Sequence, residues 1–273
     1  MSSYPNKAKS IYVLLVLAAS CVGHFSYAQI LNVEKSRIKQ DSANYFVGKI
    51  GLHFTLHNRD EDETGTNLFI GLIANTNTAY LSAKNSYILI NYINYTALGD
   101  KEASHTGYTH FRTNFSRQKK ISTEAFTQYQ YDLGRGLRTR WLAGAGVRVK
   151  LIENEETTFI FGPGLMYEFE DWVSPSEPQE SRKVDLIKSS NYLSLNKKLT
   201  DQVNLNTIAY YQAGYDEAIG RFRHRVSGEV NIAINITKKL ALATAFNCTF
   251  ENKPIVPVNK FIYTVTNGVE YNF

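Results

Sequence analysis

Apolar and polar side chains alternate along this chain from residue 45 to its end. In the clearest segment, 137–151, Trp141, Val147 and Leu151 fall on one face and Arg140 and Arg148 on the other. A period of two is typical of a β-strand with one apolar and one polar face. About twelve such segments follow one another, separated by turn residues and without a linker. The pattern therefore predicts one all-β domain over residues 45–273.

The connections between these segments are of two kinds. Short, basic connections occur at 83–85, 117–120, 197–200 and 238–239. They alternate with longer connections at 59–66, 98–105, 171–183 and 252–260. Short turns at one end and longer loops at the other are typical of an up-and-down barrel in an outer membrane.

Segment length and aromatic placement favour a membrane barrel over a soluble β-sandwich, which also hides one face of each strand. Segments of about ten to fifteen residues match a tilted crossing of the hydrocarbon layer. An even strand number lets the sheet close without a free edge. We predict an up-and-down antiparallel transmembrane β-barrel of about twelve strands. Aromatic residues near the strand ends form the expected girdles: Tyr129, Tyr131, Tyr167, Phe169, Tyr215, Tyr271 and Phe273.

The N-terminus has the organisation of a secretory signal. Lys7 and Lys9 precede the apolar run 11–19, and Ser26-Tyr27-Ala28 is a small-x-small cleavage site. We expect a signal peptide over 1–28, a periplasmic lead-in over 29–44, and export to a bacterial outer membrane. Cys21 offers an alternative as an acylated lipoprotein cysteine, for which Ala18 is a poor match three residues earlier.

Charge and cysteine content narrow the function classes. The chain has 30 Lys and Arg, two of them in the predicted signal, against 25 Asp and Glu. The mature charge of +3 is too small and too dispersed for a nucleic-acid surface. Removal of the signal would also remove Cys21 and leave Cys248 as a lone thiol on a predicted strand. No cofactor is expected.

Hairpin arithmetic predicts pairings on the polar face. In a hairpin whose turn is centred near residue 154, two residues are opposite each other when their numbers sum to 308. In a hairpin whose turn is centred at residue 238, the corresponding sum is 476. The predicted partners are Arg140 with Glu168, Arg138 with Glu170, Gly144 with Gly164, Gly146 with Gly162, and Arg225 with Glu251.

These polar-face residues allow two interpretations. Lumen charges can neutralise one another and pack the interior, or the arginines can line a passage or a site for an anionic solute. The predicted cluster comprises Arg138, Arg140, Arg148, Glu168, Glu170, Arg223, Arg225, Glu229 and Glu251. The glycine patch of Gly144, Gly146, Gly162 and Gly164 either relieves crowding in a coiled sheet or leaves volume for a substrate or an opposing Tyr.

Two weaker chemical hypotheses rest on histidines. His110, Asn114 and Ser116 share one face and suggest a lipase-like arrangement, although no Gly-x-Ser-x-Gly motif is present. His53 and His57 share the polar face of the first segment, but no further metal ligand can be identified.

The final segment alternates up to the C-terminus, with Phe261, Tyr263, Val265, Val269, Tyr271 and Phe273 on one face. Outer-membrane barrels commonly end in this way. We therefore expect Tyr271 and Phe273 to act as the signal to the barrel assembly machinery.

Several spaced motifs resemble a known family. They are Asn75-Thr-Asn-Thr-Ala-Tyr, Gly107-Tyr-Thr-His-Phe-Arg, Tyr129-Gln-Tyr-Asp, the stretch 138–146 with its Ala-Gly-Ala-Gly, and Phe161-Gly-Pro-Gly-Leu-Met-Tyr-Glu. The chain resembles the family typified by the salt-induced outer-membrane protein, domain of unknown function 481. The resemblance implies an outer-membrane β-barrel and transfers no activity or catalytic residue.

The leading hypothesis is a non-enzymatic barrel, either a narrow passage for small polar or anionic solutes or an envelope-stress barrel with a largely plugged lumen. The alternatives are an enzyme acting on lipid or polysaccharide and a surface protein that binds through loops 98–105 and 171–183. We expect a monomer whose partners are outer-membrane lipid and the barrel assembly machinery.

Overall fold

The computed structural model describes residues 44–62, 65–99, 101–174, 177–237 and 240–271. The predicted signal peptide and nearly all of the lead-in lie outside these residues. In the described part, no helix has the length and apolar character needed to cross a membrane. The strands are β1 (Tyr45–Asp62), β2 (Gly65–Leu81), β3 (Ser86–Leu98), β4 (Lys101–Phe115), β5 (Ile121–Asp132), β6 (Leu137–Glu153), β7 (Thr157–Gly162), β8 (Gly164–Ser174), β9 (Glu177–Lys198), β10 (Val203–Asp216), β11 (Arg221–Asn235), β12 (Leu240–Glu251) and β13 (Phe261–Tyr271), and a 3-10 turn, η2 (Leu133–Arg135), precedes β6.

The strands form an antiparallel meander in which each strand pairs with the next. β7 and β8 are the two halves of one predicted segment, interrupted at Pro163, and both pair with β6 and β9. The meander therefore has twelve strand positions, as the sequence predicts. The ladders of the described residues run in one path from β1 to β13, and none of them joins these two strands.

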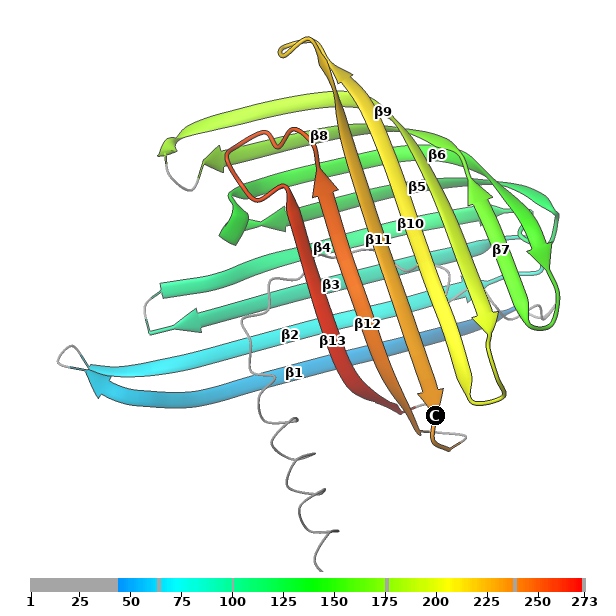
Figure 1. Ribbon diagram of the computed structural model, residues 1–273, viewed down its shortest axis with the longest axis horizontal. Helices are drawn as coiled ribbons and strands as arrows, with labels where there is room; N and C mark the ends of the chain where they lie inside the picture. The colour runs from blue at the N-terminus through cyan, green and yellow to red at the C-terminus, as the bar shows by residue number, and fades with distance from the viewer. Residues whose placement is uncertain (1–43, 63–64, 100, 175–176, 238–239, 272–273) are drawn as a thin grey trace, which may run out of the picture.

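The sheet coils so that its two halves face each other across an interior. Figure 1 shows β10–β13 crossing in front of β1–β5, while β9 bends from one layer to the other. The interior beside β1–β3 is apolar, with Ile88 and Ile90 buried against Val47 and Tyr108. Polar and charged side chains line the interior of the other strands. We call this interior the lumen.

Burial is inverted relative to a water-soluble protein. On β6, Trp141 and Leu151 are 50% and 49% exposed, whereas Arg140 and Arg148 are only 9% and 5% exposed. Exposed large apolar side chains likewise cover the outer faces of the other strands. A surface of this kind is stable against acyl chains and unstable in water. The predicted transmembrane β-barrel, with its apolar faces outward, is confirmed.

Aromatic residues gather on the outer surface near the strand ends. The ring centroids of Tyr129 and Trp141 lie 4.8 Å apart, and those of Tyr215 and Phe222 lie 5.3 Å apart. On β13, Tyr263 is exposed, as its predicted outward direction requires. Tyr271 ends β13, but its side chain and all of Phe273 lie outside the described residues, so the assembly-signal hypothesis stays a prediction.

The two ends of the barrel differ less than the sequence predicts. The turn end carries the connections 82–85, 116–120 and 199–202, and the loop end carries 252–260. Three of the predicted long loops at the loop end are instead strand extensions: β1 continues to Asp62, β3 to Leu98 and β9 begins at Glu177. Polar residues sustain these extensions, since the Ser181 hydroxyl donates a hydrogen bond of 2.6 Å to the Asp171 carboxylate across the β8–β9 pair. The binding hypothesis based on loops 98–105 and 171–183 therefore loses its long loops.

The predicted register of β6 is wrong by two residues. Arg140 is opposite Glu170 and Gly146 is opposite Gly164, so that opposite numbers sum to 310 and not 308. A bulge between Lys150 and Ile152 and a turn at 154–156 cause the shift. Because the shift is even, the side chains of β6 from Thr139 to Lys150 keep their predicted faces. The predicted pairing of Arg225 with Glu251 is confirmed.

Candidate functional site

The centre of the polar lumen is an ion-pair network made of three cations and three carboxylates. Arg225 on β11 reaches Glu168 at 3.0 Å, Glu170 at 2.9 Å and Glu251 at 3.1 Å. Arg140 on β6 pairs with Glu168 and, at 3.0 Å, with Glu170. Lys188 on β9 also pairs with Glu168. The members of the ion-pair network are Arg140, Glu168, Glu170, Lys188, Arg225 and Glu251.

The network spans part of the lumen because its members come from non-adjacent strands. β9 and β10 lie between β8, which carries Glu168, and β11, which carries Arg225. On β10, Gly214 has no side chain, and a Cβ there would lie 2.6 Å from the Cγ of Lys188. The lysine stem therefore packs over the glycine to reach Glu168. Because Glu168 is almost fully buried, removing a partner would leave an uncompensated charge in a region of low dielectric.

A ring layer lies beyond the network toward the turn end. We define it as Arg112, Glu124, Phe126, Ile160, Tyr192 and Ile208. The Arg112 guanidinium lies 5.2 Å from the Phe126 ring centroid and 5.6 Å from that of Tyr192. Glu124 accepts a hydrogen bond of 3.2 Å from the Tyr192 hydroxyl and pairs with Arg112 at 3.5 Å. Ile160, Tyr192 and Ile208 form one buried apolar cluster.

Two glycines of the predicted patch seat these rings. A Cβ on Gly162 would overlap the ring of Tyr192, and a Cβ on Gly144 would lie 2.5 Å from Phe126. For Gly162 the structure shows the opposing Tyr, since Tyr192 occupies the space over this glycine. Gly146 faces Gly164, and their missing side chains let β6 approach the Pro163 backbone, whose carbonyl accepts a hydrogen bond of 2.9 Å from Val147.

The loop end of the lumen is covered by the 252–260 connection (Figure 1). Val256 from this loop is buried against Leu137 on β6 and Trp172 on β8. The Trp172 indole donates a hydrogen bond of 3.1 Å to Glu170, which ties the cover to the ion-pair network. Asn252 holds the start of the loop, since its side-chain oxygen accepts a hydrogen bond of 2.8 Å from the backbone of His224.

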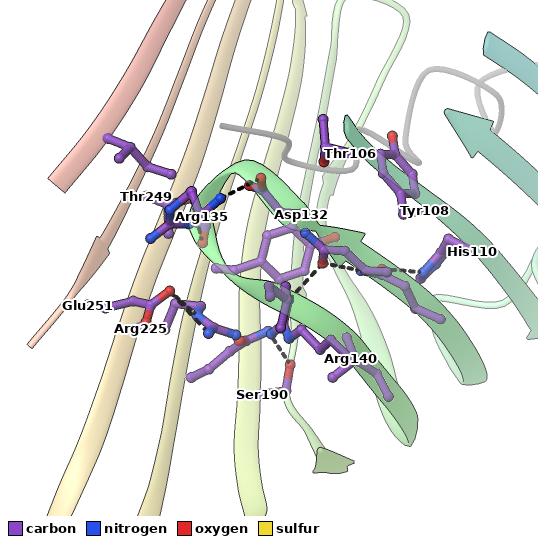
Figure 2. A pocket seen from close by; sticks show the side chains of 18 of the residues that line it. Thr106, Tyr108, His110, Asp132, Arg135, Arg140, Ser190, Arg225, Thr249 and Glu251 are labelled. Atoms are coloured by element: carbon purple, nitrogen blue, oxygen red, sulfur yellow. Dashed lines mark hydrogen bonds and ion pairs between the residues drawn. The ribbon is translucent and has the colours of Figure 1, made fainter. Parts of the chain in front are cut away.

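Two cavities lie on either side of the ring layer. The loop-end cavity has a volume of about 120 Å³, and Figure 2 shows Arg135, Arg140, Arg225 and Glu251 around it. The turn-end cavity has a volume of about 750 Å³ and is lined from β4, β6, β7, β9 and β10 and by the turns between them. No residue lines both cavities.

The structure brings together five of the nine predicted cluster residues: Arg140, Glu168, Glu170, Arg225 and Glu251. Arg148 instead lines the turn-end cavity. Arg223 pairs with Asp216 at 2.6 Å, and Glu229 is buried elsewhere on β11. Arg138 is exposed, and its prediction is wrong because a bulge between Leu137 and Thr139 shifts the strand there.

Sequence reasoning missed Lys188 and the Arg112–Glu124 pair. All three lie on the polar faces of predicted strands, so hairpin arithmetic extended to those strands would have placed them in the lumen. The burial of the 252–260 connection could also have been predicted from the sequence. Ile255, Val256 and Val258 form an apolar group between and beside two prolines, which is unusual for an exposed loop.

The residues of the lipase-like and metal-site hypotheses have the following contacts in the structure. The His110 ring contacts the Gln128 side chain at 3.0 Å, while the Asn114 amide donates to the Ser122 hydroxyl at 3.2 Å. Ser116 lies in the turn after β4 with a φ of 57°. The side chains of His53 and His57 lie outside the described residues. Among the described side chains, no three His, Cys, Asp or Glu gather as metal ligands would.

The sequence matches over residues 61–273 the family described as "Protein of unknown function, DUF481". A solved structure described as "TodX monoaromatic hydrocarbon channel deltaS2 mutant" is similar, with 10% sequence identity and a TM-score of 0.45. That alignment covers 87% of this chain and 82% of that chain. No curated protein matches the chain.

Proposed function

This chain belongs to DUF481, a family of proteins of unknown function, and we propose that it is an outer-membrane passage for small polar and anionic solutes with a closed resting state. The observation that carries the proposal is the pair of cavities at opposite ends of one polar lumen, separated by the ring layer. An interior that served packing alone has no need of a large polar cavity at one end.

The barrier between the cavities supports a closed state that can open. It consists of side chains, chiefly Tyr192, Phe126 and Arg112, and not of backbone. Rotation of exposed aromatic side chains is fast, and buried rings rotate when the surrounding packing loosens. Opening therefore requires no change in strand pairing. The ion-pair network holds the walls together on the loop-end side of this barrier.

The preference for anions rests on the position of the charges. Arg148 and Lys150 are buried in the wall of the turn-end cavity, whereas the carboxylates that line it, on Glu153, Glu155 and Glu156, are exposed at the end of β6 and in the turn after it. A solute inside this cavity lies beside Arg148 and Lys150, the second of which also pairs with Glu153 at 2.5 Å. Rings of Arg and Lys are the usual means by which pores select anions.

Single-channel recording in planar lipid bilayers tests the passage. We expect the wild-type protein to be closed for most of the record and the Tyr192→Ala variant to conduct, because the variant removes the ring that fills the space over Gly162. The control is Tyr263→Ala, which removes an outward-facing ring from β13 and should record like the wild type. Complete silence of correctly folded Tyr192→Ala, judged by its heat-modifiable gel mobility, would reject the passage and leave a plugged envelope barrel.

The remaining partners are part of the proposal. The apolar outer face fits membrane lipid, and the barrel assembly machinery is the second proposed partner. We propose a monomer without catalytic activity. The alternative of a barrel hydrolase has less support, since His110 contacts Gln128 while Asn114 contacts Ser122. Lipid turnover that disappears in His110→Ala would revive it.

A further inference from the structure

The turn-end cavity carries a ring of buried polar side chains on its wall. Following the strand pairs around the barrel, Ser86 faces Asn114, Ser122 faces Arg148, Lys150 faces Ile160, and Ile160 faces Ser194. All of the polar members are more than nine-tenths buried. We call them the polar belt: Ser86, Asn114, Ser122, Arg148, Lys150 and Ser194. Five of the six line the cavity directly, and Ser122 supports Asn114 from behind.

The Asn114 side chain of the polar belt has unmet hydrogen-bonding capacity. The Asn114 amide donates to Ser122, but its buried side-chain oxygen has no hydrogen-bond partner in the described structure. A buried acceptor without a partner costs free energy comparable to a lost hydrogen bond. Because Asn114 lines the cavity, a hydroxyl group of a solute placed there would satisfy this acceptor.

The chemistry of the belt defines the solute. Arg148 and Lys150 supply positive charge and donors for a carboxylate or similar anion. Asn114 supplies an acceptor, and the serine hydroxyls supply groups that both donate and accept. A volume of about 750 Å³ is within the range of sites for small organic ligands. The residues therefore fit a small molecule with one anionic group and several hydroxyls.

We propose that the turn-end cavity is a binding site for a sugar acid, with Arg148 and Lys150 holding the carboxylate and Asn114 accepting a hydrogen bond from a hydroxyl. This inference rests on the proposed function, because it names the class of solute that the passage holds next to its closed ring layer. The acidic turn residues Glu155 and Glu156 stand at the rim and discourage polyanions, so a single negative charge is favoured.

Isothermal titration calorimetry on the folded barrel in detergent tests the site, with D-glucuronate as the probe. D-Glucose has the hydroxyls without the charge, and acetate has the charge without the hydroxyls. We expect glucuronate to bind at least about tenfold more tightly than either, because glucose lacks the charged hydrogen bonds and acetate lacks the several hydrogen bonds of the hydroxyls. Equal binding of glucuronate and acetate would contradict the proposal, as would the absence of glucuronate binding.

Three variants locate the binding. Lys150→Gln and Asn114→Leu should each weaken glucuronate binding about tenfold or more. Arg135→Gln also removes one lumen cation, but from the loop-end cavity, and should bind like the wild type. Folding of each variant is checked by its heat-modifiable mobility, and Lys150→Gln removes only the pair of Lys150 with the exposed Glu153. A loss in Arg135→Gln equal to that in Lys150→Gln would overturn the assignment to this cavity.

The result of the glucuronate-binding test can be distinguished from the result of the conductance test. Binding without conductance in Tyr192→Ala would support a solute site in a barrel that does not transport, whereas conductance without glucuronate binding would support the passage and reject this ligand class.

Discussion

The two ends of the lumen use the same residue types with different results. Near the loop end, three cations and three carboxylates face one another on neighbouring walls, and only about 120 Å³ remains open beside them. Near the turn end, Arg148 and Lys150 are buried, the nearby carboxylates are exposed at the end of β6 and in the turn after it, and about 750 Å³ remains open. The comparison teaches that the burial of the carboxylates, and not the number of arginines, distinguishes the two ends. Where the carboxylates are buried they neutralise the cations and fill the lumen, and where they are exposed a cavity remains beside the cations.

Glu168→Gln should have the largest effect, since Arg140, Lys188 and Arg225 all pair with this carboxylate. Breaking a buried ion pair by removing one partner costs about 3 to 5 kcal/mol. We expect the free energy of unfolding, measured by urea titration in detergent or lipid, to fall by that amount.

Glu180→Gln is the matched control, because Glu180 pairs with Arg182 at 3.6 Å in an exposed position. Exposed pairs contribute about 1 kcal/mol or less. If both variants lowered stability equally, the ion-pair network would not be the element that holds the loop-end half together.

Gly162→Ala should have an intermediate effect, because the added Cβ overlaps the Tyr192 ring. Overpacking a close-fitting interior costs about 1 to 3 kcal/mol. Gly228→Ala is the control, since a Cβ there would meet its nearest atoms at 3.8 Å. In a double-mutant cycle, Tyr192→Ala should remove most of the cost of Gly162→Ala. Independent, additive effects of the two changes would contradict the seating of the ring on the glycine.

The smallest effect concerns Asp201 in the turn after β9, where Lys198 lies 2.6 Å away. The hydrogen bond and the positive charge of Lys198 lower the pKa of the Asp201 carboxyl below its ordinary value. The ionised form is therefore favoured in the folded protein, and its contribution is present at neutral pH and lost as the pH falls through the lowered pKa. Both groups are exposed, so this contribution is small and Asp201→Asn should lower the unfolding midpoint at pH 7 only slightly, while an NMR titration of the wild type should show the lowered pKa. A carboxyl pKa at or above the ordinary value would show that the pair does not form in solution.

The sequence was sufficient for the architecture of the barrel. A period of two assigned the lumen-facing and lipid-facing sides of β6 correctly, and the turn at 238 set the register of Arg225 and Glu251. It was insufficient where the ladder is irregular, because the turn at 154–156 and the bulge at Lys150 together moved the register by two, and another bulge exposed Arg138. Neither bulge has a glycine or proline that marks it in the sequence.

Which residues meet in the lumen was less predictable than which face of its strand each residue occupies. Contacts across the lumen, such as that of Arg225 with Glu168, join strands that are not neighbours, and hairpin arithmetic reaches only neighbouring strands. The inward fold of the 252–260 loop depends on Val256 meeting Leu137 and Trp172 from distant strands. The strand extensions at 171–174 and 177–183 look like a loop in sequence because polar residues predominate in them.

The two tryptophans of the chain test the central claim, that apolar faces contact lipid and polar faces enclose the lumen. Trp141 is 50% exposed on the outer face, whereas Trp172 is 2% exposed inside. The measurement is quenching of tryptophan fluorescence by brominated acyl chains in reconstituted vesicles, using Trp172→Phe to observe Trp141 alone and Trp141→Phe to observe Trp172 alone. We predict strong quenching of Trp141 and weak quenching of Trp172. Strong quenching of Trp172 together with a protected Trp141 would contradict the account.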